Sequence, residues 1–499
     1  MRSDFERITP EEAGIPSSEI LAYMKELTGA RLCLHDLLLF RNGKLVYEAY
    51  WKPMDRGFLH RQYSCSKSFV SVAVGAAIGD GLLSLDDRAA DFFPDKAPAD
   101  MHPWLAAVTI RDLLRMSTCF TQGATYTPAD PDWADTWFRA KPSHAPGRVF
   151  GYDTTATTML CIILRRVTGM EFHDYLRGKV YDKIGFDPER KSFCVETPCG
   201  HHWGGSGVVC TAYDFARFAL FCMNGGAWNG EQLVPAWYMR EATSKQIDIQ
   251  LTQTDRKNNG YGYQFWTLPD GGFSFNGMGC QFAVCMPKQG LLLVTHGYEE
   301  LATIGKPLIF EGFFRHILPY ADCALPADPP AAEALRAFTG SLKMAVPSGE
   351  TENPAASALN GRTFVFGENE LGWKRASFEF ADGGGTLRYE NASGEHTLAF
   401  GLGRQACQEF PETSYYDRRI GVPSGRGYNC YTSAAWVERA SDGGCSDALA
   451  LWCQICGSHL GQLRAVFAFA DGALTIRMEN HAEWFLQGYR GFATGELAE

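Results

Sequence analysis

A serine and a lysine three residues apart, Ser64 and Lys67, are the side chains whose types and spacing most directly suggest chemistry. They precede a run of small and apolar residues, 69–78, which predicts a buried helix with a polar first turn. Residues three apart share a face of a helix, so the Ser64 hydroxyl and the Lys67 amine can meet. The Ser64 backbone N–H would be one of the unpaired donors of that turn.

A serine hydroxyl is a weak nucleophile, and a lysine can take its proton only as the neutral amine. Burial against the apolar run and the positive end of the helix dipole both favour the neutral form. Nucleophile, base and one oxyanion donor would then lie in one turn. However, Ser-x-x-Lys is expected about once by chance in a chain of this length. The surrounding sequence must therefore decide whether this motif is catalytic.

The composition limits the function. The chain has 499 residues, a net charge of -11 and enough apolar residues for two or three domains. Its negative charge argues against nucleic acid or an anionic membrane surface as a partner. Residues 1–20 lack the apolar core of a signal peptide, and no apolar run is long enough to span a bilayer. We therefore expect a cytoplasmic protein.

Sixteen cysteines are scattered along the chain, many within apolar segments such as those around Cys161 and Cys285. Reduced, buried thiols are therefore favoured over a disulfide framework. Cys453 and Cys456, followed by His459, leave a zinc site open. No second pair with zinc spacing exists and the neighbourhood has a strand pattern, so we expect no metal and no cofactor.

Several elements should position the serine–lysine turn. A helix is predicted over 16–27, with Ser17 or Ser18 as its N-cap. Two apolar runs within 34–50 flank Asn42-Gly43, the strongest short hairpin signal, so an antiparallel sheet begins before the turn. Further helices are predicted over 109–114, 155–167, 212–221, 235–242 and 306–318, and strands over 261–266, 282–286 and 291–295.

Segment 117–146 is long, irregular and rich in aromatic residues. Such segments in enzymes often form lids or pocket walls, but the aromatic residues can equally fill a core, and the sequence leaves both readings open. The candidates for a substrate pocket are Phe120, Trp133 and Trp137.

Three segments in a fixed order carry a family resemblance. They are Ser64-Cys65-Ser66-Lys67 with the helix after it, residues 109–118, and residues 204–218. Together they resemble the serine beta-lactamase superfamily on its class C side, which includes penicillin-binding DD-peptidases, carboxylesterases and amide hydrolases of the aminohexanoate-dimer type. Over residues 10–321 the resemblance implies an α/β (α+β) beta-lactamase/transpeptidase-like fold, with an antiparallel sheet flanked by helices, a helical subdomain and a site between them.

The second motif of that superfamily is Tyr-x-Asn, and Tyr152-Asp153-Thr154 matches its tyrosine. The resemblance implies that Tyr152 moves protons beside Ser64 and Lys67, partly as a phenolate. The asparagine of relatives binds the amide of an acyl side chain, and Thr154 cannot offer the same paired donor and acceptor. This departure weakens the case for peptide-like acyl groups.

The third motif is Lys-Thr-Gly, which we align with Phe275-Asn276-Gly277. The resemblance places Phe275, Asn276, Gly277 and Gln281 beside the substrate and makes the N–H of Met278 the second oxyanion donor. The lysine that meets a substrate carboxylate in beta-lactamases and DD-peptidases is missing. An apolar Phe275 would leave that carboxylate unpaired, which favours esters or amides without it.

Other polar residues near these motifs have two readings. Arg148, His144, His201 and His202 could receive an anionic substrate, but each is more often a surface or packing residue. The paired histidines lack a third ligand at a recognisable spacing.

The character of the chain changes after residue 321. We predict a hydrolase domain over 1–321, a linker over 322–361 with a helical insert at 331–342, and an all-β domain over 362–499. Within the last, 378–391 recurs without gaps as 467–480, and both segments predict hairpins turning at Asp-Gly. This echo suggests a meander or small barrel, which could cover the cleft, mediate self-association or stabilise the chain.

The sequence thus predicts a covalent serine hydrolase with Ser64, Lys67 and Tyr152 as catalytic residues and a small ester or amide as substrate. One alternative is a beta-lactamase or D-amino-acid peptidase. Another is a non-catalytic ligand-binding relative, because the lysine and asparagine of the motifs are missing. Self-association as a homo-oligomer stays open.

Overall fold

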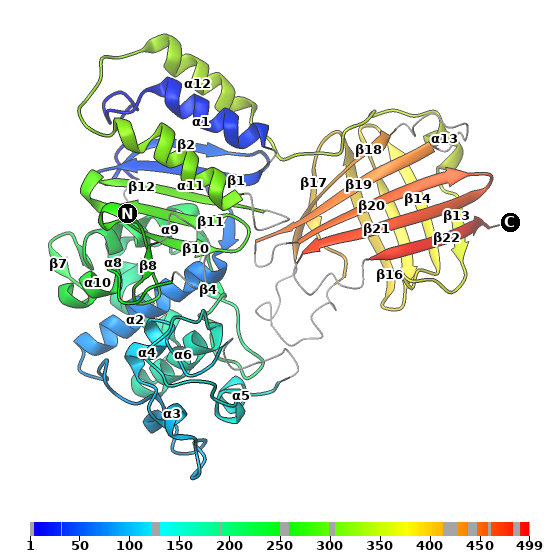
Figure 1. Cartoon of the computed structure of the whole chain (residues 1–499). Coiled ribbons are helices and arrows are strands. Elements are labelled where there is room, and N and C mark those ends of the chain that lie inside the picture. Colours follow the sequence, from blue (N-terminus) through cyan, green and yellow to red (C-terminus); the bar gives the residue numbers. More distant parts are fainter. Residues whose placement is uncertain are drawn as a thin grey trace. The chain divides into compact units, whose positions relative to one another are not determined.

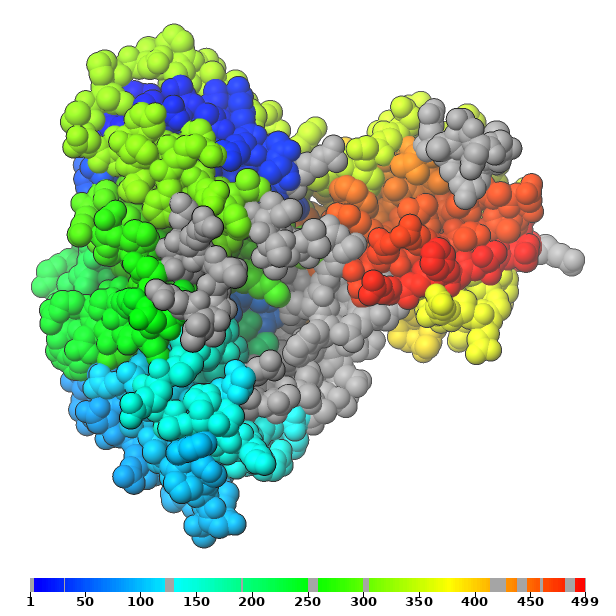
Figure 2. Space-filling view, viewed as in Figure 1, coloured from blue at the N-terminus to red at the C-terminus, as the bar shows by residue number. Residues whose placement is uncertain are grey.

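The computed structural model (Figure 1) describes residues 4–30, 32–121, 130–189, 192–249, 259–298, 305–412, 428–437, 447–457, 461–482 and 490–498. It forms two compact units, the first ending at Lys343 and the second beginning at Met344. The boundaries at residues 321 and 361 remain predictions. The helical insert is α12 (Pro329–Ser341), which packs against α1 (Ser17–Gly29) in the first unit, and Figure 2 shows the two helices side by side at its surface.

An antiparallel sheet forms the centre of the first unit. Within the described residues its strand order is β2-β1-β12-β11-β10-β9-β8. The turn between the first two strands is Asn42-Gly43, both with positive φ, which confirms the predicted hairpin. Instead of one strand over 261–266 there are two short ones, because Gln264 adopts a φ of 65° and turns the chain back. The strands are β1 Cys33–Arg41, β2 Lys44–Tyr50, β8 Gly260–Tyr261, β9 Trp266–Thr267, β10 Phe273–Gly277, β11 Gln281–Met286 and β12 Leu291–Tyr298.

Helices cover both faces of this sheet, as predicted. On one face α11 (Gly305–His316) packs beside α1, and its Phe310 lies 5.3 Å from the ring of Phe282 on β11. On the other face α9 (Ala212–Met223) packs against β11 and β12, and its Phe215 lies 5.4 Å from the ring of Phe275 on β10. α1 begins at Ser17 with Pro16 at the N-cap, so neither predicted serine caps it; the Ser17 N–H instead donates to Glu11.

A group of helices around α2 (Ser66–Gly79) forms the predicted helical subdomain. α6 (Thr154–Thr168) packs against α2, and α4 and α5 pack against α6. The Thr109 hydroxyl caps α4. The other elements are η1 Tyr63–Cys65, η2 Ala89–Phe92, α3 Pro103–Ala106, α4 Ile110–Leu114, α5 Trp133–Arg139, α7 Phe172–Leu176, η3 Arg177–Tyr181, α8 Asp182–Ile184, α10 Ala236–Ala242, η4 Pro269–Gly271, η5 Pro287–Gln289, η6 Leu318–Tyr320, the sheet of β3 Leu59–Arg61, β5 Val208–Thr211 and β4 Phe193–Cys194, and the pair β6 Ala227–Trp228 and β7 Glu231–Gln232.

The second unit is a closed β-barrel, one of the two architectures, meander or small barrel, that the sequence suggested. Its described strands follow the order β16-β15-β14-β13-β22-β21-β20-β19-β18-β17, and a parallel pairing of β16 with β18 closes the circle. The elements are α13 Ala355–Leu359, β13 Thr363–Phe366, β14 Arg375–Ala381, β15 Gly384–Asn391, β16 Gly394–Leu402, β17 Ala406–Glu409, β18 Asn429–Val437, β19 Asp447–Cys456, β20 Gly461–Ala470, β21 Ala473–Ala482 and β22 Gly491–Leu497.

The two echoing segments form hairpins of this barrel. β14 and β15 turn at Asp382-Gly383, and β20 and β21 turn at Asp471-Gly472, as predicted. Phe378 and Phe467, which occupy equivalent places in the echo, are fully buried and their ring centroids lie 5.1 Å apart. The equivalent residues of the two hairpins therefore pack on one another in the barrel core.

A search of the described residues for a helix that is long and apolar enough to cross a membrane finds none.

Candidate active site

Ser64 lies in a short 3₁₀ turn, η1, just before α2. We predicted that it would lie in the first turn of the α-helix, but that helix begins two residues later, at Ser66. The cause is Tyr63, whose φ of 47° is a left-handed conformation that few non-glycine residues adopt. The predicted pairing holds nevertheless, because Lys67 Nζ lies 3.1 Å from Ser64 Oγ.

Lys67 is almost completely buried, with 1% of its surface exposed. Its Nζ donates a hydrogen bond to the Gly205 carbonyl at 2.6 Å and lies 5.0 Å from the centre of the Tyr152 ring. A buried amine needs such partners, because burying it without them costs several kcal/mol. Ser64 itself is half-buried, so the pair sits at the boundary between core and solvent.

The segment that carries the Gly205 carbonyl is tightly held. The buried Arg61 donates from Nε to the Ser206 carbonyl at 2.8 Å. A Cβ on Gly205 would come within 2.6 Å of the Thr154 methyl group, so only glycine fits there. This is the structural role of the glycine pair in segment 204–218.

Tyr152 lies just before α6, separated from the helix by one residue, Asp153. Its ring stacks on Trp266 with 5.8 Å between centroids. The next residue, Asp153, caps the helix by accepting hydrogen bonds from the N–H groups of Thr155 and Ala156. Burial raises the pKa of Asp153, although these hydrogen bonds oppose the rise. Sequence reasoning did not assign this cap, yet an aspartate before an apolar helix is the usual signal for one.

The Tyr152 hydroxyl and the Tyr152 ring differ in their contacts with Ser64 and Lys67. Among the residues that the structure describes, it makes no hydrogen bond to Ser64 or Lys67; the contact to Lys67 is made by the ring face. Catalytic hydrogen bonds are often long before substrate binds. The catalytic role of Tyr152 therefore stays a prediction.

The end of β10 touches the serine turn. A Cβ on Gly277 would come within 2.4 Å of the Gln62 carbonyl and 3.1 Å of Cys65 Sγ, so glycine is required at this crossing. The Cys65 thiol also donates to the Gln281 carbonyl at 3.1 Å. Met278 follows this crossing directly. The predicted oxyanion hole consists of the N–H groups of Met278 and Ser64. The position of Met278 beside the crossing is compatible with this role, which remains a prediction.

Phe275 does not lie at a substrate surface, which corrects our expectation. It is fully buried, with its ring 5.1 Å from that of Phe265 and 5.4 Å from that of Phe215. Side chains alternate along a strand, so Phe275 points to the face packed by α9 while Asn276 points to the opposite face. A side chain at 275 can therefore influence substrate only through the packing of β10.

Gln281 likewise has no group left for a substrate. Its amide nitrogen donates to the carbonyls of Met278, Gly279 and Gly297 at 2.6, 2.8 and 3.0 Å. Its amide oxygen accepts the Gly297 N–H at 3.1 Å. The prediction of substrate contact is therefore wrong for the side chain, which fixes the turn that carries Met278.

The three aromatic residues of segment 117–146 that were candidates for a substrate pocket belong to the core. Phe120, Trp133 and Trp137 are 4%, 1% and 1% exposed. Phe120 and Trp137 meet edge to face at 4.9 Å, and Trp133 meets Trp203 in the same way at 5.5 Å. Of the two readings that the sequence left open, the core reading holds. Thr154 is half-exposed at the start of α6, and its contact with substrate stays a prediction.

Lys306 is a residue that the sequence did not indicate. It lies in the first turn of α11, and its Nζ is 3.2 Å from the side-chain oxygen of Asn276 when that amide is oriented to satisfy its neighbours. It also lies 5.6 Å from the centre of the Trp266 ring, on which Tyr152 stacks. A cation therefore does border the third-motif strand. No local pattern could reveal it, because it comes from a helix that follows two further strands.

The remaining candidate residues lie in varied surroundings. Arg148 is exposed, and the His144 ring contacts the Ser143 hydroxyl at 2.8 Å. His201 contacts Glu171 through its ring, and His202 donates its backbone N–H to the same carboxylate.

Cys453 and Cys456 lie on β19, where residues three apart point to opposite faces, so they do not suit one metal ion. His459 lies outside the described residues.

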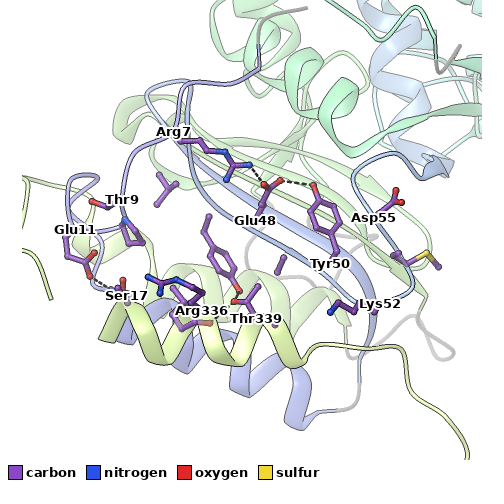
Figure 3. A pocket seen from close by; sticks show the side chains of 18 residues that line it. Arg7, Thr9, Glu11, Ser17, Glu48, Tyr50, Lys52, Asp55, Arg336 and Thr339 are labelled. Atoms are coloured by element: carbon purple, nitrogen blue, oxygen red, sulfur yellow. Dashed lines mark hydrogen bonds and ion pairs between the residues drawn. The ribbon is translucent and has the colours of Figure 1, made fainter. Parts of the chain in front are cut away.

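A separate pocket of about 660 Å³ lies between β2 and α12 in the first unit (Figure 3). The Arg7 side chain and the Tyr50 hydroxyl both bond the Glu48 carboxylate on one side, and Arg336 and Thr339 line the other. None of the three motifs contributes to its lining. It is therefore not part of the candidate active site.

The sheet flanked by helices, the helical subdomain and the Ser64–Lys67 pair at their junction define a beta-lactamase/transpeptidase-like protein. Residues 35–296 match the family described as Beta-lactamase, and the chain belongs to that family. The 6-aminohexanoate-dimer hydrolase of Paenarthrobacter ureafaciens is 25% identical over 221 residues, which are 40% of this chain and 55% of that protein. A fimbrial assembly protein FimD of Dichelobacter nodosus, serogroup H1, is 27% identical over 235 residues, with 40% and 56% covered.

The matched region thus spans about half the length of these curated relatives. Among solved structures, a penicillin-binding protein homologue from Caulobacter crescentus is similar over 63% of this chain and 100% of its own, with a TM-score of 0.51 and 15% identity. This likeness confirms the predicted fold of the first unit.

Proposed function

We propose that the protein is a serine hydrolase that cleaves an ester or amide through an acyl-enzyme. The observation that carries the proposal is the placement of Lys67, whose Nζ lies 3.1 Å from Ser64 Oγ while it donates to the Gly205 carbonyl. A neutral amine that donates one hydrogen to Gly205 can aim its lone pair at the Ser64 hydroxyl hydrogen. The pair is then prepared for proton transfer.

In the acylation step, Ser64 Oγ bonds to the substrate carbonyl carbon as its proton passes to the Lys67 amine, which later returns one proton to the Tyr152 oxygen. The carbonyl oxygen becomes an oxyanion, which the N–H groups of Ser64 and Met278 would hold. The tetrahedral intermediate collapses by breaking the bond to the leaving alcohol or amine. That group takes the proton from Tyr152, and the acyl group stays on Ser64.

In the deacylation step, water attacks the acyl carbon and gives its proton to the same groups. The bond to Ser64 Oγ breaks, the oxygen regains a proton, and the acid leaves. An alcohol or amine in place of water would give acyl transfer by the same chemistry.

A fluorophosphonate probe with an intact-mass readout tests the proposal. We expect one adduct per chain, located at Ser64 by peptide mapping and absent from Ser64→Ala. A protein that is folded by circular dichroism and still takes no adduct would instead be the third alternative, a ligand-binding relative without turnover.

A second candidate, a beta-lactamase or D-amino-acid peptidase, is favoured by one observation. The case against a substrate carboxylate depended on the missing lysine at 275, and Lys306 brings a cation to the same strand from α11. Parallel rates for short p-nitrophenyl esters and nitrocefin decide between the two. We expect ester turnover to dominate, and fast nitrocefin turnover would reverse the order.

Two further predictions remain from the sequence: a small ester or amide as the substrate, without nucleic acid or a membrane as partner, and a location in the cytoplasm. Self-association as a homo-oligomer stays open. Hydrolysis of a panel of small esters and amides, cell fractionation and light scattering of the purified protein test these three points.

A further inference from the structure

Four polar side chains are buried together behind the serine turn. Asp36 comes from β1, His60 from β3, His296 from β12, and Gln62 follows β3 by one residue. They are 1%, 2%, 0% and 0% exposed. Such groups are stable in a core only when their hydrogen bonds are satisfied, so their bonding pattern is informative.

Two histidines and a carboxylate could in principle bind a metal ion, and the candidate ligand atoms lie within 4.8 Å of one another. The rings of His60 and His296, however, stack with 4.4 Å between centroids and 11° between planes. An imidazole binds a metal through a lone pair in its own plane, so stacked rings do not aim at one point. The Asp36 carboxylate faces both rings instead. One oxygen lies 2.8 Å from His296 Nδ1, and the other lies 3.0 Å from His60 Nε2 without hydrogen-bond geometry.

The hydrogen bonds fix the protons of His296. The Gln62 amide nitrogen donates to the His60 carbonyl at 2.9 Å, which fixes the amide orientation. Its oxygen therefore faces His296 Nε2 at 3.1 Å. His296 Nδ1 faces the Asp36 carboxylate. Both ring nitrogens face acceptors, so both must carry a hydrogen.

The pKa shifts of Asp36 and His60 reflect the same contacts. Burial alone would raise the pKa of Asp36, but the charges of His296 and His60 and the hydrogen bond from His296 hold it below its ordinary value. Burial and then repulsion by His296 lower the pKa of His60, so His60 stays neutral. Three other titratable groups act on this cluster: His35 of β1, Tyr50 of β2 and Cys210 of β5.

Gln62 connects the cluster to the serine. Its backbone N–H donates to the Val208 carbonyl at 2.7 Å, and its carbonyl accepts the Cys65 N–H at 3.0 Å. Between these two bonds the chain passes through the left-handed Tyr63, a conformation that needs support from its surroundings. The same Gln62 carbonyl forms the crossing with Gly277. The position of Gln62 therefore sets where Ser64 lies relative to the end of β10.

We infer that His296 is a buried imidazolium paired with Asp36, and that it is a positioning residue which holds Gln62 and thereby the turn that presents Ser64. The catalytic part of this inference depends on the proposed function. The charge state of the ring does not, so the two can fail separately.

Selective ¹⁵N-histidine NMR at neutral pH tests the charge state. We expect one histidine with both ring nitrogens protonated, absent from the spectrum of His296→Gln. If that variant does not fold, Gln62→Met, which removes the acceptor at Nε2, must shift the same pair of signals. A neutral tautomer at His296 would overturn the inference, whether or not Ser64 reacts.

Turnover per active site tests the positioning role. For Asp36→Asn and His296→Gln, the concentration of reactive sites is first titrated with the fluorophosphonate, so that unfolded protein is not counted. We expect kcat per site to fall about 10- to 100-fold, as small misplacements of reacting groups do, with KM within about threefold. His173→Gln, at a buried histidine on α7, is the matched control and should keep its kcat.

An unchanged kcat per titrated site in both cluster variants would overturn the positioning role and reduce the cluster to a stabilising one. If the unmodified protein takes no adduct at Ser64, the proposed function fails, while the NMR result still decides the charge of His296.

Discussion

The serine turn and the third-motif strand form two sides of the same candidate site, yet they are built differently. At the serine turn, Ser64 and Lys67 are three residues apart and meet at 3.1 Å. At the strand, Phe275 points into the core, and the cation nearby is Lys306 from a later helix. The pair that would do chemistry is local in sequence, whereas the group that could select a substrate is assembled by tertiary structure.

This difference suggests that the two sides fail in different ways. A change at the serine turn should stop the reaction with every substrate. A change at the strand should alter stability or the choice of substrate and leave the acylation chemistry in place. The following predictions test that separation.

The largest effect is expected for Lys67→Met, which keeps an unbranched side chain one atom shorter and removes the amine. Ser64 then has no adjacent base, and kcat should fall by about 10⁴-fold or more. Fluorophosphonate labelling should slow in parallel with ester turnover. Lys183→Met, at an exposed lysine paired with Glu231, is the control. Rapid labelling of Lys67→Met would show that another group takes the serine proton.

A smaller loss is expected for Tyr152→Phe, which removes the hydroxyl and keeps the ring contacts to Lys67 and Trp266. If the hydroxyl transfers protons, kcat should fall about 10²- to 10⁴-fold with little change in the free energy of unfolding. Tyr261→Phe changes a buried tyrosine that also packs on Trp266, and it should keep its activity. An active Tyr152→Phe would limit Tyr152 to packing.

Phe275→Lys introduces the lysine of the superfamily's third motif and tests the third-motif strand. Because position 275 is enclosed by aromatic rings, we expect no gain of nitrocefin turnover. The free energy of unfolding of the first unit should fall by about 3–5 kcal/mol, the cost of a buried unpaired charge. Phe275→Leu should lose only about 1–2 kcal/mol in urea denaturation. A stable Phe275→Lys that hydrolyses nitrocefin would contradict the core assignment.

The smallest effect is expected for Lys306→Gln. If Lys306 attracts a substrate anion, kcat/KM for an ester that carries a carboxylate should fall about tenfold relative to its neutral methyl ester. For each ester, kcat should equal that of the unmodified protein. Lys288→Gln, at an exposed lysine between β11 and β12, is the control. An equal fall in kcat/KM for both esters would show that Lys306 only holds Asn276 in place.

Particular residues mark where sequence reasoning succeeded and where it stopped. Asn42-Gly43 and Asp471-Gly472 fixed hairpins because those dipeptides accept the positive φ of tight turns. The apolar runs located the helices to within a few residues. The start of α2 was misplaced because the left-handed Tyr63 has no propensity signal. Gln281 and Trp133 looked like pocket residues, since burial by distant elements cannot be read from their own neighbours.

The sequence by itself determined the pairing of Ser64 with Lys67, the individual helices and the hairpin turns, because these depend on contacts between residues close in the chain. The arrangement of the sheet was expected only from the family resemblance, since its central pairing of β1 with β12 joins distant segments. Only the tertiary structure decided that Phe275 is core, that Lys306 borders Asn276, and that Asp36 and His296 meet behind the serine turn. Asp36 and His296 are 260 residues apart. Such contacts depend on strand order and on which face each strand presents, and no local pattern encodes them.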